Sequence, residues 1–223
     1  MKKLLIAAAL LSTVGGGALL LNAGPSGAQT AEPPLTRDAV TSDVLAPTRS
    51  PKDQNITIVV FQDYQCPVCR KVHPDIERLL ASDKRIRVVY RDWPIFGGAS
   101  IEAAKAAIAS NYQGRHAAFN DALMRMPGRL SSETIRAAAA KAGVDWARLQ
   151  SDLDKHKGEI DALISRNNRM APAIGLQGTP AFIIGSYLIP GGMDLANLKE
   201  TVKMARENPG EPEMPEAAEA SGM

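Results

Sequence analysis

Two things are scarce in this chain: cysteine, and an excess of charge of either sign. Only 2 of its 223 residues are cysteine, which excludes a scaffold stapled by several disulfides and any four-cysteine metal or iron–sulfur site. Lysine and arginine number 26 against 24 acidic residues, so the formal net charge is only +2. Without a strong basic excess, nucleic acid is not an expected partner. The length and the 45% of hydrophobic residues suit one globular domain with a proper core.

The first 28 residues are predicted to be an export signal. Lys2 and Lys3 give a positive start, residues 4–21 form an uncharged and mostly apolar run, and small residues follow at 26–28. An uncleaved membrane anchor is the alternative, because this run lies at the short edge of the length that spans a bilayer. No cysteine lies near the cleavage site, which excludes a lipid-anchored lipoprotein.

Two further segments have compositions that do not favour a packed core. Residues 29–53 are rich in Pro, Thr, Ser and charge and are predicted to be a leading arm or linker. Residues 208–223 contain four glutamates, three prolines and no Lys or Arg, so we expect a disordered acidic tail. Residues 54–207 are then expected to form a single domain.

The order of strand and helix patterns within residues 54–207 indicates the fold class. Residues 56–61 and 86–91 are apolar, β-branched runs of strand length, and a helical pattern that opens at Pro67 separates them. A strand, a helix and a strand at this spacing form a βαβ unit with parallel strands. Further patterns are a helical region, two short strands that form a hairpin and a last helix, at about 98–172, 181–184, 187–189 and 195–207. The sequence therefore predicts an α/β fold with a mixed sheet and a helical insertion.

The two cysteines form a Cys-Pro-Val-Cys motif, and two inert roles for it are weak. A structural disulfide between Cys66 and Cys69 would close a very short loop and remove little unfolded-state entropy. Structural zinc needs four ligands, and even with His73, four residues after Cys69, one ligand is missing. No metal is therefore expected at this motif.

Thiol–disulfide exchange is the functional interpretation of the motif. The pair follows a strand and opens a helix, where free backbone N–H groups and the helix dipole favour a thiolate over a thiol. Cys66 is expected to be the attacking sulfur, and Cys69, one turn further, the resolving thiol. Thr179 and Pro180 stand at the head of the third strand, which the predicted topology places near Cys66. We expect backbone groups of Thr179 to pair with an extended substrate chain there.

These residues resemble the thioredoxin superfamily, in particular exported thiol:disulfide interchange proteins of the DsbA type. The similar segments lie within about residues 50–205 and are FQDYQCPVC, YRDWPIFG and GTPAF at 61–69, 90–97 and 178–182. The resemblance implies a thioredoxin fold, catalysis by Cys66 with Cys69, and a cis peptide bond before Pro180. It also implies, as partners, unfolded or misfolded exported proteins and a membrane redox partner that resets the cysteine pair. No cofactor is implied.

Two positions depart from the family pattern. Val68 stands where DsbA has a histidine, and Val60 stands six residues before the first cysteine, where family members usually carry an acid. With Val60 there, water or Asp63 is left to take the proton of the resolving thiol, although Asp63 is better explained as a polar group at the strand end. Four aromatic residues could pack in the core or line a peptide groove: Tyr64, Trp93, Phe96 and Tyr187.

Three functions remain open at this point. The leading one is a periplasmic enzyme that forms, isomerises or reduces disulfides in exported proteins. The second is a binding module in which Cys66 and Cys69 hold a soft ion such as Cu(I), which two thiolates can bind. The third is a docking role for the helical insertion beside an inert disulfide.

Overall fold

The computed structural model describes residues 36–210. The predicted export signal or membrane anchor, the start of the leading arm and nearly all of the predicted acidic tail lie outside these residues. The helices are α1 (Arg37–Thr41), α2 (Pro67–Ser82), α3 (Gly98–Ser110), the 3₁₀ helix η1 (Asn111–Gln113), α4 (His116–Met124), α5 (Ser132–Lys141), α6 (Trp146–Lys155), α7 (Lys157–Ala173) and α8 (Leu195–Glu207). The strands are β1 (Thr48–Arg49), β2 (Ile56–Gln62), β3 (Ile86–Asp92), β4 (Ala181–Ile184) and β5 (Tyr187–Pro190).

The five strands form one mixed sheet in the order β1-β3-β2-β4-β5. Strands β2 and β3 are parallel and in register from Ile56 opposite Ile86 to Gln62 opposite Asp92. The other neighbouring pairs, β1 with β3, β2 with β4 and β4 with β5, are antiparallel. The α/β fold with a mixed sheet that the sequence predicts is therefore confirmed.

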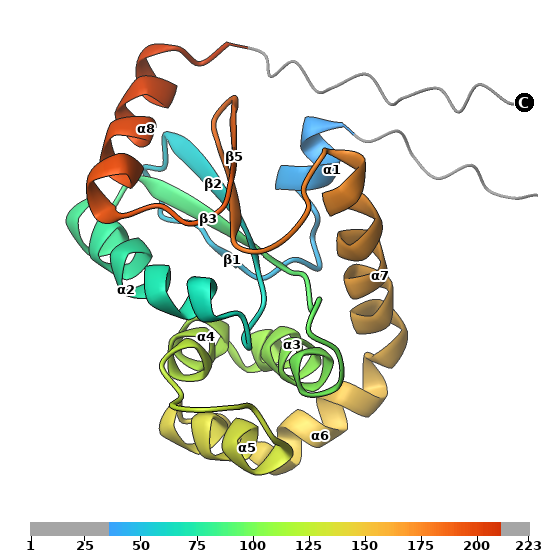
Figure 1. The fold of residues 1–223 in the computed structure, drawn as a ribbon. Coiled ribbons are helices and arrows are strands. Elements are labelled where there is room, and N and C mark those ends of the chain that lie inside the picture. The colour runs from blue at the N-terminus through green and yellow to red at the C-terminus, as the bar shows by residue number, and fades with distance from the viewer. Residues whose placement is uncertain (1–35, 211–223) are drawn as a thin grey trace, which may run out of the picture. The chain divides into compact units, whose positions relative to one another are not determined.

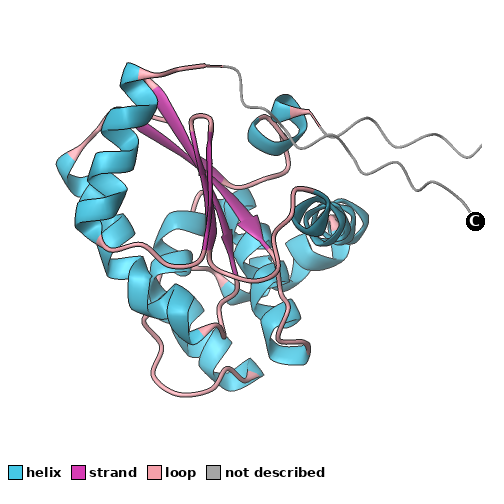
Figure 2. Cartoon of the chain, turned by 45° about the horizontal axis from the view of Figure 1, so that its top comes forward, coloured by secondary structure: helices cyan, strands magenta, loops and turns pink. Residues whose placement is uncertain are grey.

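Both faces of the sheet are covered by helices, as Figures 1 and 2 show. Successive side chains of a strand point to opposite faces, so alternate residues of β2 enter different parts of the core. Ile58 and Val60 pack with apolar residues of α2 and α8. Val59 and Phe61 pack on the other face, with apolar residues of the helices between β3 and β4. Burial on both faces explains why β2 is apolar almost throughout.

The helical insertion consists of five α-helices and one 3₁₀ turn, between β3 and β4. Ser131 and Asp145 cap α5 and α6, and each accepts a hydrogen bond from the backbone N–H of the third residue of its helix. Ser100 lies in the first turn of α3, and its hydroxyl donates to Asp63 Oδ1 at 2.7 Å.

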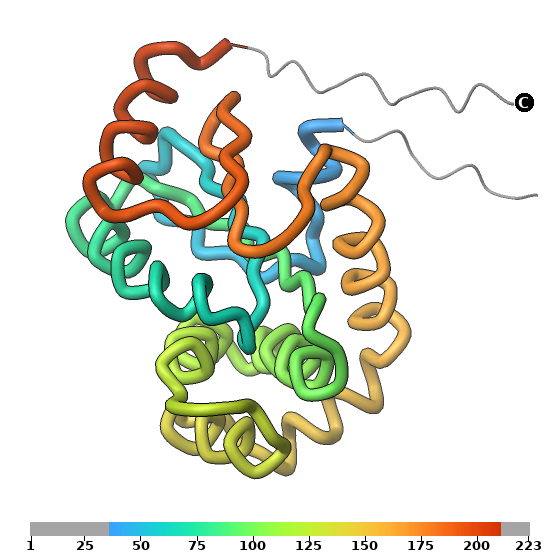
Figure 3. The backbone as a smooth tube through the Cα atoms, in the orientation of Figure 1, coloured from blue at the N-terminus to red at the C-terminus, as the bar shows by residue number. Residues whose placement is uncertain are grey.

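The segment predicted as a leading arm or linker enters the fold from Arg37 onward. It forms α1 and then β1, which pairs with β3 through Thr48 opposite Val89. Figure 3 shows this N-terminal segment, in blue, beside the orange helix α7, and Arg166 of α7 donates to both carboxylate oxygens of Asp43 at 3.0 and 3.1 Å. Its polar composition concealed this packing because several of its contacts are made by main-chain carbonyls.

No helix within residues 36–210 combines the length and apolar character needed to cross a membrane.

Candidate active site

Cys66 is the residue that caps the N-terminus of α2. It follows β2 by a short turn and has an extended backbone, and Pro67 occupies the first helical position, where no N–H is needed. The Cys66 sulfur accepts a hydrogen bond from the backbone N–H of Cys69 at 3.4 Å. Both cysteines are free thiols, and they are only 3% and 2% exposed. The local sequence thus places one sulfur at the helix N-terminus and the other one turn inside.

The surroundings of the two sulfurs separate their acidities. Hydrogen bonding from the Cys69 thiol lowers the pKa of Cys66 to about 5, with help from Thr179 and from the N–H groups of Cys69 and Val68 against the opposing effect of burial. Burial raises the pKa of Cys69 far above its usual value, and its hydrogen bond to Cys66 raises it further. Near neutral pH, Cys66 is therefore a thiolate and Cys69 a thiol. A thiolate at Cys66 and a thiol at Cys69 are what the predicted roles of attacking and resolving sulfur require, and those roles stay a prediction.

Thr179 and Pro180 lie beside Cys66, and the peptide bond between them is cis. The antiparallel pairing of β2 with β4 sets Phe61 opposite Ala181 and so brings the start of β4 to the end of β2. The Cys66 sulfur lies 3.2 Å from the Thr179 carbonyl oxygen, to which it donates a hydrogen bond only in its thiol form. The Thr179 hydroxyl oxygen is buried and has no other hydrogen-bond partner within residues 36–210, so it is available to the Cys66 thiolate, whose pKa it helps to lower.

Asp63 ties together the loops on either side of the cysteines. Its Oδ1 accepts from the N–H of Gln65 at 2.7 Å as well as from Ser100, and its Oδ2 accepts from the N–H of Phe96 at 3.1 Å. Asp63 is only 1% exposed. Three donors therefore occupy its oxygens, which fits the structural role expected for it better than a role in proton transfer.

The aromatic residues divide between the core and the surface. Tyr64 and Trp93 are buried, and Trp93 packs edge-on against Phe61 with ring centroids 6.4 Å apart. Phe96 is 49% exposed, and Tyr187 is partly buried against the core between the sheet, α2 and α8. Val68, between the cysteines, is 45% exposed. Val68, between the cysteines, and Phe96, whose backbone N–H bonds Asp63, thus expose apolar surface.

The sequence did not single out two groups of polar residues that lie near the cysteines. Arg70 follows Cys69, and its Nε donates to the Tyr64 carbonyl at 2.6 Å while its Nη1 donates to the Gly128 carbonyl. This clamp fixes a positive charge near Asp63 and Cys66.

The second group is a buried polar cluster at the ends of β2 and β3. Gln62 Nε2 lies 3.0 Å from Asp92 Oδ1, 2.6 Å from Asn120 Oδ1 and 3.3 Å from the Tyr64 hydroxyl. All four residues are at most 2% exposed. Burial raises the pKa of Asp92 to about 7, which the hydrogen bonds of Gln62 and Tyr64 only partly offset, and the charge of Asp63 adds to the rise. Polar residues at two strand ends were the only available sequence signal.

Two of the three histidines are buried away from any metal-ligand set. His73 Nε2 lies 2.8 Å from Asp121 Oδ1, and burial lowers the pKa of His116 to about 3. Among the described residues no group of three or more His, Cys, Asp or Glu side chains is placed to hold a metal ion.

The chain matches a known thioredoxin family over most of its length. The DsbA-like thioredoxin domain matches residues 57–203. A thioredoxin-like oxidoreductase from Silicibacter pomeroyi DSS-3 superposes with a TM-score of 0.73 at 35% identity, over 77% of this chain and 98% of that one. A periplasmic thioredoxin-like protein from Salmonella enterica serovar Typhimurium gives 0.71 at 28% identity, over 79% and 98%. The thiol-disulfide exchange protein alpha-DsbA2 from Wolbachia pipientis gives 0.71 at 28% identity, over 75% and 90%.

The curated relatives are much longer proteins. The chain is 27% identical over 160 residues to the Na(+)/H(+) antiporter NhaA 1 of Salinispora arenicola, a match that covers 70% of this chain and 24% of the antiporter. A match to the NhaA antiporter of Herminiimonas arsenicoxydans, 25% identical over 190 residues, covers 85% and 30%. The chain thus spans about a quarter of the length of the curated relatives it matches.

Proposed function

The chain belongs to the DsbA-like thioredoxin family, and on that premise we propose that it exchanges disulfides with exported proteins through Cys66 and Cys69. The observation that carries the proposal is the contrast between the two sulfurs. Cys66 is ionised at neutral pH, its pKa lowered to about 5, while burial keeps Cys69 a thiol. A thiolate is the nucleophile of disulfide exchange, so only Cys66 is ready to attack or to be released.

When the enzyme oxidises a substrate, a substrate thiolate attacks the Cys66 sulfur of the Cys66–Cys69 disulfide. The Cys66–Cys69 bond breaks, a mixed disulfide forms at Cys66, and Cys69 leaves as a thiolate that takes up a proton. A second substrate thiolate then displaces Cys66, which leaves as a stable thiolate while the substrate gains its disulfide. Reduction of a substrate follows the same steps in reverse.

Oxidation of substrates is the direction that the lowered pKa favours. Stabilising the Cys66 thiolate stabilises the reduced enzyme relative to its disulfide, which makes the disulfide form a better oxidant. Burial of Cys69 leaves this equilibrium unchanged near neutral pH, where the reduced enzyme holds Cys69 as a thiol. It makes the Cys69 thiolate a poor leaving group, so we expect it to slow the attack of a substrate on the disulfide.

Substrate binding is proposed at Thr179 and Pro180 and on the adjacent apolar surface. The Thr179 carbonyl lies 3.2 Å from the Cys66 sulfur, so an extended chain that pairs with this backbone would present its own sulfur to Cys66. The exposed side chains of Val68 and Phe96 suit apolar residues of an unfolded chain.

The cellular setting is also a proposal. The signal-like residues 1–28 and a periplasmic relative of known structure support a periplasmic location. There, a membrane redox partner is required to reoxidise the cysteine pair, because each turnover that oxidises a substrate leaves the enzyme as a dithiol.

Trapping of mixed disulfides in cells tests the function. Cys69→Ser should accumulate covalent complexes with exported proteins through Cys66, and the complexes should disappear on reduction. Cys66→Ser is the matched control and should trap nothing. If Cys66→Ser traps as many partners as Cys69→Ser, the assignment of the two sulfurs is reversed. If neither variant traps a partner, the proposed function is contradicted.

A further inference from the structure

The loop that joins β5 to α8 lies against both halves of the candidate active site. The Gly191 N–H donates a hydrogen bond to the Pro180 carbonyl at 2.9 Å, which ties the loop to the head of β4. The next residue, Gly192, lies against α2: a Cβ atom at Gly192 would be 2.9 Å from Val68 Cγ1 and 3.0 Å from Val72 Cγ1. The loop therefore bridges the cis peptide bond and the first two turns of the cysteine helix.

Close approach, and not backbone conformation, requires glycine at position 192. Gly192 is not among the glycines with a positive φ, so its backbone suits a residue with a side chain. Carbon atoms in van der Waals contact are about 3.5–4.0 Å apart, so a Cβ atom at 2.9 Å would force a neighbour or the loop to move. Within residues 36–210, Gly185 is the one other glycine with so little space, and its positive φ already explains glycine there.

The surroundings of Gly192 leave little room for such a movement. Val72 and Met193 are both buried in the core between the sheet, α2 and α8. Valine is branched at Cβ and stiff, so its methyl groups do not swing aside freely. On the other side, Asp194 caps α8 by accepting a hydrogen bond from the Asn197 N–H at 2.8 Å. Because close-packed interiors transmit strain, a side chain at position 192 would shift the loop relative to α2.

The contacts of the loop form a closed path around Cys66. The Cys66 sulfur lies 3.2 Å from the Thr179 carbonyl oxygen, and the cis peptide bond joins Thr179 to Pro180. Pro180 is hydrogen-bonded to the loop, and the loop packs on Val68, which is in the same helical turn as Cys66. A shift of the loop relative to α2 would therefore change the separation between Cys66 and Thr179.

We propose that Gly192 is a positioning residue of the exchange site, whose lack of a side chain lets the loop hold the head of β4 against α2. The separation set in this way is the one that the contact between Cys66 and Thr179 requires. This role rests on the proposed function and deepens it, because it names a residue that acts on Cys66 through Val68 and Pro180. Thr179 helps to lower the pKa of Cys66, so a wider separation should raise that pKa.

The variant Gly192→Ala tests this role with a single added methyl group. The Cys66 pKa, measured as the midpoint of thiolate absorbance in the reduced protein, should rise by about half a unit, because the contribution of Thr179 is weakened. A loss of folding stability alone would lower the unfolding midpoint in urea without moving this titration.

Gly178→Ala is the matched control. Gly178 precedes Thr179, has no positive φ, and a Cβ atom there would meet no described atom within 4 Å beyond its chain neighbours. The Cys66 pKa of this variant should equal the wild-type value. An unchanged Cys66 pKa in Gly192→Ala, or an equal rise in Gly178→Ala, would overturn the role of Gly192.

Shortening Val68 should relieve the effect of the added methyl group. Val68→Ala removes the Cγ1 atom that would lie nearest to the new Cβ atom, so adding Gly192→Ala to this variant should raise the Cys66 pKa less than it does in the wild type. Val68→Thr keeps the branch at Cβ, and in this variant the rise should persist. The same rise in the wild type and in Val68→Ala would contradict a role that acts through Val68.

Measurements on the reduced wild-type protein keep the proposal testable if Gly192→Ala does not fold. Nuclear Overhauser contacts should join the α-protons of Gly192 to methyl groups of Val68 and Val72, which lie close to it. Absence of these contacts would overturn the positioning role and leave the proposed function intact. Failure of the reduced wild type to exchange with an aromatic disulfide reagent would instead contradict the proposed function itself.

Discussion

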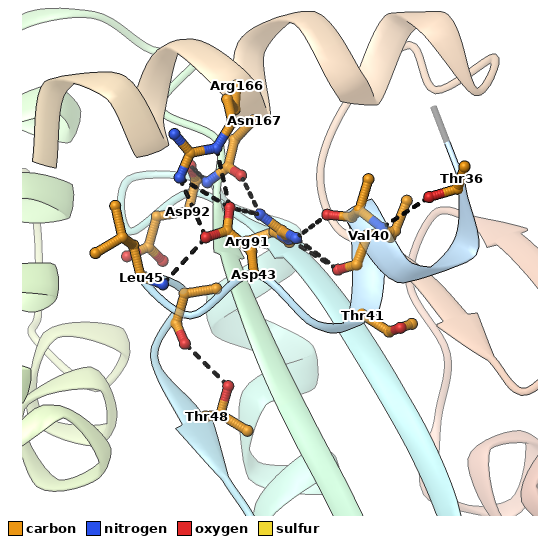
Figure 4. A network of polar contacts seen from close by, with 12 residues as sticks. Thr36, Val40, Thr41, Asp43, Leu45, Thr48, Arg91, Asp92, Arg166 and Asn167 are labelled. Atoms are coloured by element: carbon orange, nitrogen blue, oxygen red, sulfur yellow. Dashed lines mark hydrogen bonds and ion pairs between the residues drawn. The ribbon is translucent and has the colours of Figure 1, made fainter. Parts of the chain in front are cut away.

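Arg91 and Asp92 are neighbours at the end of β3 and both are buried, but the hydrogen bonds of Arg91 are complete and those of Asp92 are not. Arg91 is fully buried, yet all five of its N–H groups find acceptors, as Figure 4 shows. The acceptors, at 2.6 to 3.2 Å, are Asp43, Asn167 and the carbonyls of Ala39 and Val40. Asp92, on the other face, has one carboxyl oxygen with no hydrogen-bond partner within residues 36–210.

The pKa values of Asp43, the partner of Arg91, and of Asp92 show the effect of this difference in pairing. Burial raises the pKa of Asp43, but the N–H of Leu45 and the guanidinium groups of Arg91 and Arg166 bring it below its usual range. For Asp92, burial dominates and raises the pKa to about 7. A fully paired buried charge stabilises one structure, whereas an underpaired one titrates in the range where enzymes work. Arg91 therefore serves the fold, whereas Asp92 is a buried group that titrates near neutral pH.

The largest effect is expected from breaking the Arg91 network. Arg91→Met should lower the free energy of unfolding by roughly 3–5 kcal/mol, because Asp43 and several main-chain carbonyls would lose their buried partner. Arg166→Met is the control, since Arg166 also pairs with Asp43 but is partly exposed, and it should cost about 1 kcal/mol or less. Urea unfolding at neutral pH measures both. Equal losses would show that burial of Arg91 does not set its contribution.

Asp92→Asn is expected to raise the free energy of unfolding, whereas Arg91→Met lowers it, and the gain should depend on pH. The raised pKa means that the folded wild type binds a proton more tightly than the unfolded chain, so its stability falls as pH rises from about 4 to about 7 and then levels off. The variant lacks this loss. Above pH 7 it should be more stable than the wild type by up to about 4 kcal/mol, and near pH 4 the difference should vanish. A difference independent of pH in urea unfolding would show that Asp92 does not titrate in this range.

The two neighbours also mark the limit of what the sequence could predict. Cys66, Cys69, Thr179 and Pro180 were predicted because their chemistry lies in short motifs at strand ends, and the structure brings them together. Asp92 was visible only as part of a family-like segment. Its buried polar setting depends on strand register and on Asn120, a residue of α4 that a long helical insertion brings to the sheet.

The Arg91 network was hidden for a different reason. Main-chain carbonyls provide three of its contacts, and they belong to a segment whose polar composition indicated a linker. Composition reports how much apolar surface a segment can bury, but it does not report which carbonyls a distant arginine will reach.

A smaller effect is expected at the Thr179 hydroxyl. Thr179→Val keeps the shape of the side chain but removes a donor toward the Cys66 thiolate, so the pKa of Cys66 should rise by about one unit. Thr179→Ser, which keeps the hydroxyl, should leave the pKa close to the wild-type value. Thiolate absorbance of the reduced proteins as a function of pH measures the shift. The same Cys66 pKa in Thr179→Val and the wild type would show that the hydroxyl does not stabilise the Cys66 thiolate.

Alkylation of the reduced wild-type protein as a function of pH tests the division between the two sulfurs most directly. After a short pulse of reagent, the protein is unfolded and digested, and the label on each cysteine is counted by peptide mass spectrometry. Labelling of Cys66 should rise with a midpoint near pH 5, and Cys69 should remain unlabelled through neutral pH. Labelling of Cys69 before Cys66, or a Cys66 midpoint at the usual thiol value of about 8.5, would contradict the account.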